Sequence, residues 1–565
     1  MVTRGCAGIV KPNPRYACTT MTTNISPIPA SARAALRDPN WKAAMEAEYG
    51  ALLANSMWEL VPRPPGANVV TGKWVFRVKY KPDGSLDRYK ARWVVRGFSQ
   101  RPGVDFGETF SPVVKPATIR TVLTLVASRG WQARQLDVSN AFLHGNLSER
   151  VYCQQPIGFV DPRRPHDVCL LSKSLYGLKQ APCAWYERFA GFIAMIGFTP
   201  TRSDTSLFVL RRGTAMAILL LYVDDMIITA STTALLRQVI NELQAEFVVK
   251  DMGDLHFFLG VEVTRSAGGF HLSQTQYAEE LLDRAGMSNC RPISTPIDVK
   301  PKLPAASGEP VSDPSEYRRI AGALQWMTLT RPDIAHAIQQ ICLHMHDPRE
   351  GHLALIKRVL RYLQGTTDHG LHLPASRSLD IVAYSDADWA GCPDMHRSTS
   401  GYCVYLGDAL VSWSSKRQPT VSRSSAEAEY RAIANAVSEC CWLRQLLGEL
   451  SVPVDKATLV YCDNISSVYM ASNPVHHRRT KHIELDIHFV REKMAVGDVR
   501  VLHVPTGQQF ADIMTKGLPS SVFQEFRSSL GISPTDATTA GGCWRRDHVV
   551  PGNPLHDPLS VDHGG

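Results

Sequence analysis

The stretch from Ala217 to Ile228 reads AILLLYVDDMII, and it decides the fold more than any other part of the 565-residue sequence. Two adjacent acids, Asp224 and Asp225, separate two apolar segments that have the length of buried strands, without the Gly, Asn or Pro that usually marks a turn. Neighbouring carboxylates at the ends of buried strands repel each other and raise one pKa unless a cation joins them. We therefore favour a site for Mg²⁺, which prefers oxygen ligands, over an Asp-Asp turn without a chemical role.

A basic hairpin is predicted upstream of these strands. Between Lys73 and Arg101 there are nine cations and two acids. The cations alternate with apolar and aromatic residues on both sides of a turn at residues 82–84, which places them on one face of each strand. They are Arg77, Lys79 and Lys81 before the turn and Arg88, Lys90 and Arg92 after it. A cationic face suits the phosphates of a nucleic acid, although a merely solvated strand face remains the alternative.

Acids also end strand-like segments elsewhere in the chain. Asp137 lies in the segment QLDVSNAF from Gln135 to Phe142, and Asp386 and Asp463 each follow a run of apolar residues. Asp512 belongs to a short predicted helix that Gly517 ends. Each of these acids, taken alone, is more often an ordinary polar residue than a ligand.

Glu429 is predicted to lie on the buried face of a helix. The helix begins with a capping box in which Ser424 is the N-cap and Glu427 the third helical residue. Counting in steps of four from Glu429 gives Ile433 and Val437, so this acid shares their apolar stripe. A buried carboxylate requires a partner, and a metal ion shared with the acids at the strand ends would supply one.

Several motifs resemble those of reverse transcriptases, and of the copia class of LTR-retrotransposon polyproteins in particular. Tyr222 to Asp225 resembles the YxDD box, and Leu136 to Val138 with Ala141 and Phe142 resembles the first catalytic motif. Similarity to the copia class lies in Ser174 to Pro182 (SLYGLKQAP), Arg88 to Arg92 (RYKAR) and Trp185-Tyr186. The acids Asp386, Glu429, Asp463 and Asp512 resemble, in order and setting, the four acids of the ribonuclease H fold.

The resemblance implies an α+β right-hand polymerase with fingers, palm and thumb or connection, followed by an α/β ribonuclease H-like domain. The segments expected are a poorly ordered N-terminal part (1–35), fingers and palm with the primer-grip region (36–290), a Pro-rich linker with a helical thumb or connection (291–375), the ribonuclease H-like domain (376–530) and a disordered tail (531–565). The 24 residues from Arg291 to Pro314 contain six prolines, which prevent a long helix there.

The resemblance also implies roles for individual residues. Two Mg²⁺ ions per active site, with Mn²⁺ as a substitute, would be held by Asp137, Asp224 and Asp225 in the polymerase and by Asp386, Glu429, Asp463 and Asp512 in the nuclease. The nucleotide would be bound by Lys90, Arg92, Phe142, Gly177, Lys179 and Gln180. Nucleic acid would be bound by Arg77, Lys79, Arg88, Phe258, Gly260, Arg478, Lys481 and His482. Burial explains Phe258 equally well, core packing is the alternative for Phe142, and a solvated helix start is the alternative for the last three residues.

The expected function is RNA-directed DNA synthesis by two-metal nucleotidyl transfer, with degradation of the RNA strand of the hybrid. The partners would be an RNA template, a DNA or RNA primer, the RNA/DNA hybrid and dNTPs. A catalytically inactive relic or domesticated nucleic-acid-binding module is the alternative, and a protein in which only the nuclease works is a third possibility. The oligomeric state stays open.

Composition agrees with a soluble, multidomain protein. Hydrophobic residues make up 44% and charged residues 20% of the chain, with a net charge of +8. The longest apolar run is too short for a membrane span, and thirteen Cys without a CxxC pair favour reduced thiols over disulfides or zinc. We expect a cytoplasmic location, in a virus-like particle if the full element is expressed, with the nucleus as an alternative. Sequence signatures of capsid, protease and integrase are missing, so the chain is expected to be part of a longer element.

Overall fold

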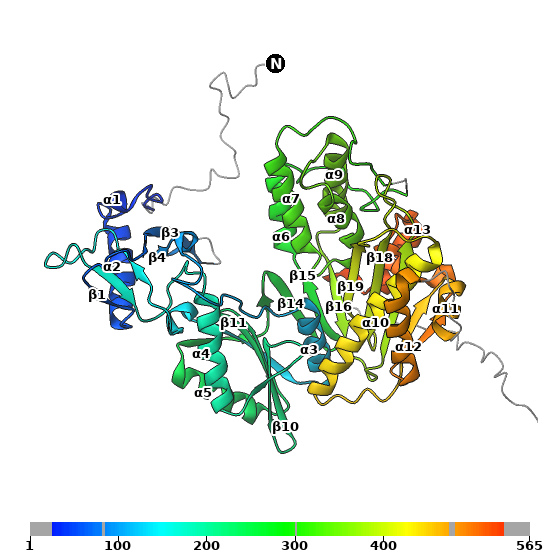
Figure 1. Ribbon diagram of the computed structural model, residues 1–565, viewed down its shortest axis with the longest axis horizontal. Coiled ribbons are helices and arrows are strands. Elements are labelled where there is room, and N and C mark those ends of the chain that lie inside the picture. The colour runs from blue at the N-terminus through cyan, green and yellow to red at the C-terminus, as the bar shows by residue number, and fades with distance from the viewer. Residues whose placement is uncertain (1–24, 82–84, 300–301, 474–480, 536–565) are drawn as a thin grey trace, which may run out of the picture. The chain divides into compact units, whose positions relative to one another are not determined.

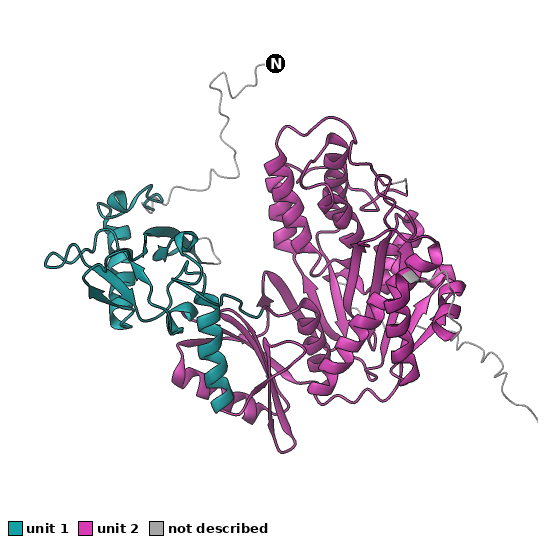
Figure 2. Ribbon diagram, viewed as in Figure 1, with its two compact units in different colours: residues 1–112, 140–195 teal, residues 113–139, 196–565 magenta. Residues whose placement is uncertain are grey.

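The computed structural model describes residues 25–81, 85–299, 302–473 and 481–535, and its elements are labelled in Figure 1. The chain forms two compact units, each assembled from two separate stretches of sequence. Unit 1 contains residues 1–112 and 140–195, and unit 2 contains residues 113–139 and 196–565 (Figure 2). The five segments expected from the sequence follow another criterion and remain a prediction.

In unit 1, helix α2 (Pro39–Ala54) covers the apolar face of a hairpin formed by β3 (Gly72–Tyr80) and β4 (Leu86–Val95). The helix begins where Asp38 accepts hydrogen bonds from the backbone of Asn40 and Trp41, with Pro39 at the first helical position. Trp41 is fully buried, and its ring meets Tyr89 edge-on with a 4.8 Å separation between ring centroids. One face of the hairpin is thereby packed, and the opposite face carries the cations.

The rest of unit 1 forms a small sheet in the order β1-β7-β6-β2, together with short helices and the longer α4. The elements are α1 (Ala32–Ala35), β1 (Trp58–Val61), β2 (Val69–Val70), η3 (Gly97–Ser99), η4 (Ala141–His144), β6 (Tyr152–Cys153), β7 (Val168–Leu171) and α4 (Ala181–Met195). Buried side chains of α1, β2, η4, β6 and β7, with Ala181 at the start of α4, belong to the same core as Trp41 and the hairpin.

Unit 2 begins with an antiparallel sheet of six strands in the order β12-β5-β11-β10-β9-β8. Its elements are α3 (Pro116–Arg129), β5 (Gln132–Val138), β8 (Thr199–Pro200), β9 (Leu207–Arg212), β10 (Ala215–Tyr222), β11 (Asp225–Ala230), α5 (Thr233–Glu246) and β12 (Val249–Asp254). Every residue from Met216 to Leu221 is buried, which agrees with the strand predicted there. This is the sheet that the sequence assigns to the palm.

A second sheet of unit 2 has the order β13-β14-β15-β16-β22, and helices α6 to α9 accompany it in sequence. The elements are β13 (Phe257–Phe258), β14 (Val261–Ser266), β15 (Gly269–Ser273), α6 (Thr275–Arg284), α7 (Pro314–Met327), η5 (Pro332–Ile334), α8 (Ala335–Cys342), α9 (Glu350–Gln364), β16 (His369–Pro374), α13 (Ser520–Ser529) and β22 (Ile532–Pro534). Strand β22, near the end of the described chain, thus pairs with β16.

The third sheet of unit 2 has the order β19-β18-β17-β20-β21. Strands β17, β18 and β19 are antiparallel neighbours, whereas β20 and β21 continue parallel to β17. The elements are β17 (Ile381–Asp388), β18 (Thr399–Leu406), β19 (Ala409–Arg417), α10 (Ser425–Glu449), β20 (Thr458–Cys462), α11 (Ile465–Ser472), η6 (Lys481–Ile483), α12 (Glu484–Ala495), β21 (Val499–His503), η7 (Thr506–Gln508) and η8 (Phe510–Met514). This order and these directions agree with the ribonuclease H-like domain expected from the sequence.

Within unit 2, helix α3 packs against β19 of this third sheet. Buried Arg120 donates from Nε to the carbonyl oxygen of Val411 at 2.7 Å. Lys115 forms a 2.7 Å ion pair with Glu439 of α10. Helix α3 and the residue before it are therefore tied to the third sheet and to α10 by buried and half-buried polar contacts, and both sheets contribute to one shared core.

The described part of the chain contains no helix that is both long and apolar enough to span a bilayer.

Candidate functional site

The first carboxylate cluster lies where β10 turns into β11. Tyr222 pairs with Asp225, which leaves Val223 and Asp224 as a two-residue turn. On the other side of β11, Asp225 lies opposite Asp137 of β5, and the backbone N–H of Val138 donates to the carbonyl oxygen of Asp224 at 2.9 Å. The structure thus brings Asp137, Asp224 and Asp225 to one edge of the sheet. We call these three residues the palm cluster.

The turn of the palm cluster contains an unusual backbone conformation. Val223 has φ of +56°, in the left-handed region. This region is disfavoured for β-branched residues, and the first position of such a hairpin turn normally takes Gly. The sequence alone indicated that ordinary turn residues are missing here, and the structure shows that the cost falls on the backbone of Val223. Such strain is typical of functional sites.

The electrostatics of the palm cluster favour a cation. Asp224 is exposed, whereas Asp137 and Asp225 are half-buried. Burial, followed by the charges of Asp224 and Asp137, raises the pKa of Asp225 to about 6. Lys250 of β12 lies opposite Asp137 in the register, on the side away from Asp225. A divalent ion between the carboxylates would relieve their repulsion.

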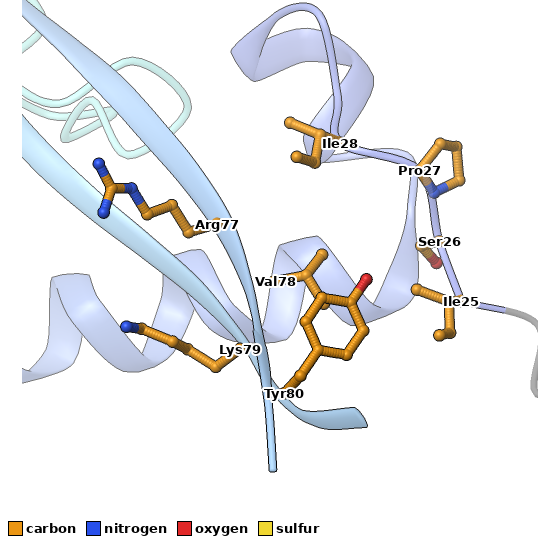
Figure 3. A pocket seen from close by; sticks show the side chains of 8 residues that line it. All are labelled: Ile25, Ser26, Pro27, Ile28, Arg77, Val78, Lys79 and Tyr80. Atoms are coloured by element: carbon orange, nitrogen blue, oxygen red, sulfur yellow. The ribbon is translucent and has the colours of Figure 1, made fainter. Parts of the chain in front are cut away.

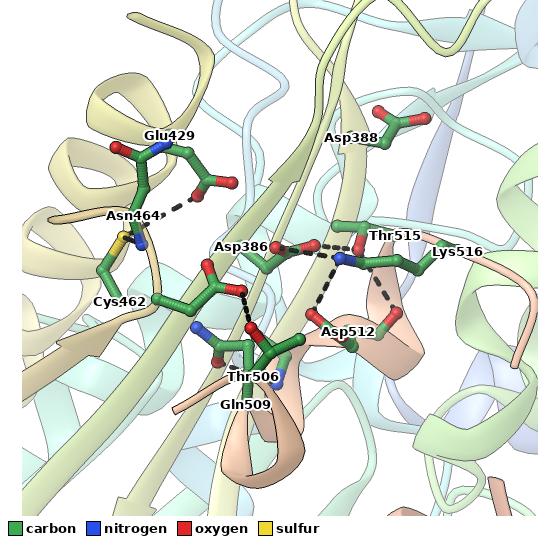
Figure 4. Close-up of polar contacts among 12 residues, drawn as sticks. Asp386, Asp388, Glu429, Cys462, Asn464, Thr506, Gln509, Asp512, Thr515 and Lys516 are labelled. Atoms are coloured by element: carbon green, nitrogen blue, oxygen red, sulfur yellow. Dashed lines mark hydrogen bonds and ion pairs between the residues drawn. The ribbon is translucent and has the colours of Figure 1, made fainter. Parts of the chain in front are cut away.

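The second carboxylate cluster lies in the third sheet of unit 2 (Figure 4). Asp386 near the end of β17 is 1% exposed, Asp463 follows β20, Glu429 is in α10 and Asp512 is in η8. Ligand atoms of Asp386, Asp463 and Asp512 lie within 4.8 Å of one another, and so do those of Glu429, Cys462 and Asp463. We call the four acids the nuclease cluster. Cys462 beside Glu429 was not expected from the sequence.

The local structure explains how Glu429 reaches this cluster. Ser424 caps α10 by accepting from the backbone N–H of Glu427 at 3.3 Å, as the capping box predicts. The second half of the box differs, because the Glu427 carboxylate accepts from the N–H of Arg423 rather than from that of Ser424. Glu429, two residues further on, is 6% exposed, so its predicted place on the buried face is confirmed.

Burial makes it unfavourable for the acids of the nuclease cluster to be ionised without a cation beside them. The pKa values of Glu429, Asp463 and Asp512 all rise above their ordinary values, first because the groups are buried and then because neighbouring carboxylates repel them. Lys516 Nζ lies 3.0 Å from Asp512 Oδ1 and 3.4 Å from Asp386 Oδ1. The hydroxyl of Thr515, a fully buried residue, donates to Asp386 Oδ2.

Gly401 of β18 is a further residue that shapes this site, and sequence reasoning missed it. It lies opposite Asp386 in the register. A Cβ at this position would come within 2.6 Å of Met514 Cβ and 2.7 Å of Thr515 Cγ2. Only a glycine therefore allows η8, with Asp512, to approach the end of β17. The spacing of glycines in the sequence offered no signal for this contact.

Both clusters have the donors that Mg²⁺ prefers. Two oxygens bound to one Mg²⁺ at about 2.1 Å are at most about 4.2 Å apart, which is close to the separations in the nuclease cluster. Carboxylate oxygens dominate the donor set of the nuclease cluster, and its residues therefore fit hard divalent ions. The three acids of the palm cluster are of the same type, and their proximity is shown by the strand register and by the effect of Asp224 and Asp137 on the pKa of Asp225.

In the cationic hairpin of unit 1, the strand register places the cations of β3 directly opposite those of β4. Arg77 lies opposite Lys90, and Lys79 lies opposite Arg88. Like charges in directly opposite positions destabilise a hairpin unless an anion lies over them. Burial, followed by the charge of Arg92, lowers the pKa of Lys90. The predicted turn at residues 82–84 lies outside the described residues.

The two faces of β3 are visible beside an open pocket of about 390 Å³ (Figure 3). Arg77 and Lys79 project to one side of the strand, whereas Val78 and Tyr80 point toward residues 25–28. The alternation predicted from the sequence is therefore present, and both cations are exposed.

A second group of expected residues meets elsewhere in unit 1. The guanidinium of Arg92 lies 4.4 Å from the centroid of the Tyr176 ring, and Phe142 packs edge-on against the same ring. Tyr176 was quoted only as part of a motif, yet it joins these two residues.

The loop that follows Tyr176 is held by a buried polar network. Gly177 has φ of +94°, and a Cβ there would meet the carbonyl oxygen of Val95 at 2.0 Å. Gln100 donates to the side-chain oxygen of Gln180 and accepts from the N–H of Lys179, both at 2.9 Å. These bonds hold Lys179 and Gln180 against Gln100, and the N–H of Val95, which donates to the carbonyl oxygen of Tyr176 at 2.8 Å, holds the start of the loop beside the end of β4.

The expected primer-grip residues have structural explanations of their own. Phe258 is 4% exposed and lines an apolar cavity of about 180 Å³ with Tyr222 and Trp326. Leu259 and Gly260 form the turn between β13 and β14, and both have positive φ. Burial thus accounts for Phe258 and turn geometry for Gly260, while their contact with nucleic acid remains a prediction.

The expected basic grip of the nuclease is described only in part. Arg478 lies outside the described residues, as does the side chain of Lys481. His482 is exposed, and its carbonyl oxygen accepts from Arg431 of α10 at 3.4 Å.

Comparisons with known proteins bear on the family to which the chain belongs. The family model for reverse transcriptase (RNA-dependent DNA polymerase) matches residues 55–299. The Pol polyprotein from transposon RE1 of Arabidopsis thaliana is 48% identical over 534 residues, which are 94% of this chain and 36% of that protein. An uncharacterized mitochondrial protein of the same plant is 48% identical over 224 residues, 40% of this chain and 93% of its own length.

Among solved structures, a foamy viral protease-reverse transcriptase in complex with an RNA/DNA hybrid is 11% identical, with a TM-score of 0.46. That alignment covers 82% of this chain and 54% of the viral one. The chain spans about a third of the length of the Pol polyproteins that it matches.

The α+β polymerase-like fold followed by a ribonuclease H-like domain, predicted from the sequence, is confirmed. The chain belongs to the reverse transcriptase family found in the Pol polyproteins of copia-type LTR retrotransposons.

Proposed function

We propose that this chain is an RNA-directed DNA polymerase that also hydrolyses the RNA strand of the RNA/DNA hybrid. The observation that carries the proposal is the presence of two separate carboxylate clusters in one chain, the palm cluster at a hairpin turn and the nuclease cluster at the end of β17. Each offers the oxygen ligands to divalent ions on which two-metal phosphodiester chemistry depends.

In the polymerase, Asp137 and Asp224 are the main ligands and Asp225 is a weaker one. Bound Mg²⁺ ions would activate the primer 3′-hydroxyl and neutralise the charge of the triphosphate. The chain's own contribution is to hold the three carboxylates at one sheet edge, with Asp224 facing solvent. The strained turn at Val223 supports this role, because it presents Asp224 outside the packed strand.

Unit 1 would supply the nucleotide contacts of the polymerase. Lys90 and Arg92 bind the triphosphate, and Phe142 excludes a 2′-hydroxyl, so that dNTPs are used. Support comes from the contacts of Arg92 and Phe142 with the one ring of Tyr176, which fix the cation and the ring relative to each other. Gly177, Lys179 and Gln180 form the loop beside the templating base, and the buried network around Gln100 keeps that loop rigid.

The basic hairpin would bind template or primer phosphates through Arg77, Lys79 and Arg88. The opposed cations of its register are repelled in the absence of a polyanion, and this repulsion supports the assignment. Phe258 and Gly260 would shape the primer grip, Phe258 from within the core. Arg478, Lys481 and His482 would hold the backbone of the hybrid next to the nuclease.

In the nuclease, Asp386, Glu429, Asp463 and Asp512 hold the ions that activate water against the RNA strand. The burial of Asp386, Glu429 and Asp512 supports this role, since buried carboxylates close to one another are costly to keep ionised without a cation between them.

Two assays on the 565-residue chain test the proposal. Extension of a labelled primer on an RNA template and cleavage of a labelled RNA/DNA hybrid are measured with Mg²⁺, with Mn²⁺ and with EDTA. We expect both activities with either ion and neither with EDTA. Cleavage without extension would leave only a nuclease, and binding of the hybrid without either activity would identify a silent binding module.

A further inference from the structure

Lys516 lies inside the nuclease cluster (Figure 4), and neither the fold nor the proposed hydrolysis assigns it a role. Its Nζ is 3.0 Å from Asp512 Oδ1 and 3.4 Å from Asp386 Oδ1. The side chain of Lys516 is 40% exposed, whereas those of Asp512 and Asp386 are 7% and 1% exposed. The ammonium group therefore reaches from the surface to two buried carboxylates.

The backbone directs Lys516 to this place. Helix η8 ends at Met514, and the hydroxyl of the next residue, Thr515, donates a hydrogen bond to Asp386. Directly after Lys516, a Cβ on Gly517 would lie 2.0 Å from the carbonyl oxygen of Asp298. The chain is thus packed on both sides of Lys516, and two consecutive residues, Thr515 and Lys516, direct their donors at Asp386.

The environment of Lys516 differs from that of an ordinary surface ion pair. Lys456 and Asp380 in the same part of unit 2 also form a 2.7 Å pair, but their side chains are 74% and 44% exposed. Exposed pairs of this kind contribute little to stability. A carboxylate as buried as Asp386, in contrast, is expensive without a cation, and Lys516 supplies one from the chain itself.

The oxygens that Lys516 contacts are oxygens that a divalent ion would need. Asp386 and Asp512 belong, with Asp463, to the group whose ligand atoms lie within 4.8 Å of one another. One ammonium and one divalent ion cannot both occupy the space between the same two carboxylates.

We propose that Lys516 is a positioning residue whose ammonium holds Asp386 and Asp512 together in the metal-free protein and competes with a divalent ion for these two carboxylates. The inference rests on the proposed nuclease function. Lys516 stabilises the arrangement of the carboxylates in the metal-free form. It thereby lowers the apparent affinity of the site for the ion, because each ion that binds displaces the ammonium. The site is then preformed and releases its ion readily.

The test measures Mn²⁺ binding by the electron paramagnetic resonance signal of free Mn²⁺, together with thermal unfolding in EDTA. Every protein carries Asp224→Asn, which weakens the palm cluster and leaves the nuclease cluster as the main site. We expect Lys516→Met to bind Mn²⁺ about 5- to 150-fold more tightly, the usual range for coupling between two ligands. The same variant should unfold at a lower temperature in EDTA and gain more from added Mg²⁺ than the parent.

Two further variants make the outcome decisive. Lys456→Met removes an exposed lysine of the same region and should change neither affinity nor unfolding. Lys516→Arg keeps the positive charge and should stay close to the parent, which retains a comparison if Lys516→Met folds poorly. Equal or weaker Mn²⁺ binding by folded Lys516→Met would overturn the competition.

A failure of the proposed function gives a different result. Glu429→Gln in the same background should reduce Mn²⁺ binding, because Glu429 is a proposed ligand. If Glu429→Gln leaves the titration unchanged, the nuclease site itself is wrong and the competition at Lys516 falls with it. If Glu429→Gln weakens binding while Lys516→Met does not strengthen it, only the role of Lys516 is refuted.

Discussion

The palm and nuclease clusters both consist of carboxylates, but they differ in burial and in how the backbone brings the acids together. In the palm cluster, two of the three acids are consecutive residues at a hairpin turn, and Asp224 is exposed. In the nuclease cluster, four acids from distant parts of the sequence meet, three of them buried and Asp463 half-buried, and Lys516 lies among them. The first cluster depends on local backbone geometry, and the second depends on long-range packing.

The cost of each cluster differs accordingly. The palm cluster places strain in the backbone, at the left-handed Val223. The nuclease cluster places the cost in desolvation, which raises the pKa values of Glu429, Asp463 and Asp512. The comparison teaches that the chain itself supplies a cation, Lys516, to the nuclease cluster, whereas in the palm cluster Asp224 is exposed and burial raises the pKa of the half-buried Asp225.

Removal of one ligand from each cluster should have the largest effect. We expect Asp224→Asn to lower primer extension by more than about 100-fold and to spare hybrid cleavage, and Glu429→Gln to do the reverse, since even partners outside a metal's own ligands are worth about 10- to 100-fold. Both assays are run on each variant.

The matched controls for this pair are Asp254→Asn and Glu492→Gln, whose side chains are 85% and 67% exposed. Both should leave both activities near those of the parent. Loss of extension and cleavage together in folded Asp224→Asn or Glu429→Gln would contradict two independent clusters.

A methyl group at Gly401 should have the next largest effect, and only in the nuclease. Gly401→Ala pushes against Met514 and Thr515 and so displaces Asp512. We expect cleavage to fall by about 10- to 100-fold, as for other residues that orient ligands, with extension unchanged. Gly448→Ala in α10, where a Cβ meets nothing within 4 Å, is the control and should keep full cleavage. Equal cleavage by both variants would show that η8 can shift without cost.

The free energy of unfolding of the metal-free protein should depend on pH in a way that reveals the raised pKa of Asp225. The pKa of Asp225 rises from about 3.9 in the unfolded chain to about 6 in the folded one. The folded state therefore binds this proton more tightly, and the contribution of Asp225 to stability falls as pH rises from about 4 to 6.

Urea unfolding in EDTA across this pH range measures the effect. Asp225→Asn cannot ionise, so the difference in free energy of unfolding between the variant and the parent should grow in favour of the variant from pH 4 to pH 6. Added Mg²⁺ should reduce that difference. A difference that shrinks with rising pH would have the wrong sign and would reject the raised pKa of Asp225, which burial and then the neighbouring carboxylates cause.

Relief of the strain at Val223 should have the smallest effect. Asn tolerates the left-handed region better than Val does, so Val223→Asn should raise the free energy of unfolding by about 1 kcal/mol. Val248→Asn, at a 67% exposed position without positive φ, is the control and should change stability little. A loss of stability in Val223→Asn would mean that the valine side chain contributes more than its backbone costs.

The central strands of the palm-like sheet and the basic hairpin could be predicted from the sequence, because their signals are local. Adjacent acids between apolar segments predicted two buried strands with a metal site between them, and cations in alternation with aromatic residues predicted a basic hairpin. Strands β10, β11, β3 and β4 are present, and the tight turn between β10 and β11 was not predicted. The contact of Tyr176 with Arg92 and Phe142 was not predicted, since it depends on the packing of residues that are 84 and 34 positions apart in the sequence.

By itself, the sequence determined which residues are acids at strand ends, that Glu429 shares the buried stripe of its helix, and that the chain resembles copia-type reverse transcriptases. Only the tertiary structure decided that Gly401 leaves room for Asp512, that Thr515 and Lys516 both reach Asp386, and that Val223 bears the strain of its turn. The physical reason is that periodicity and capping act between residues a few positions apart. A cluster drawn from residues 386, 429, 463 and 512 exists only once the parallel pairing of β17 with β20 has brought distant segments together.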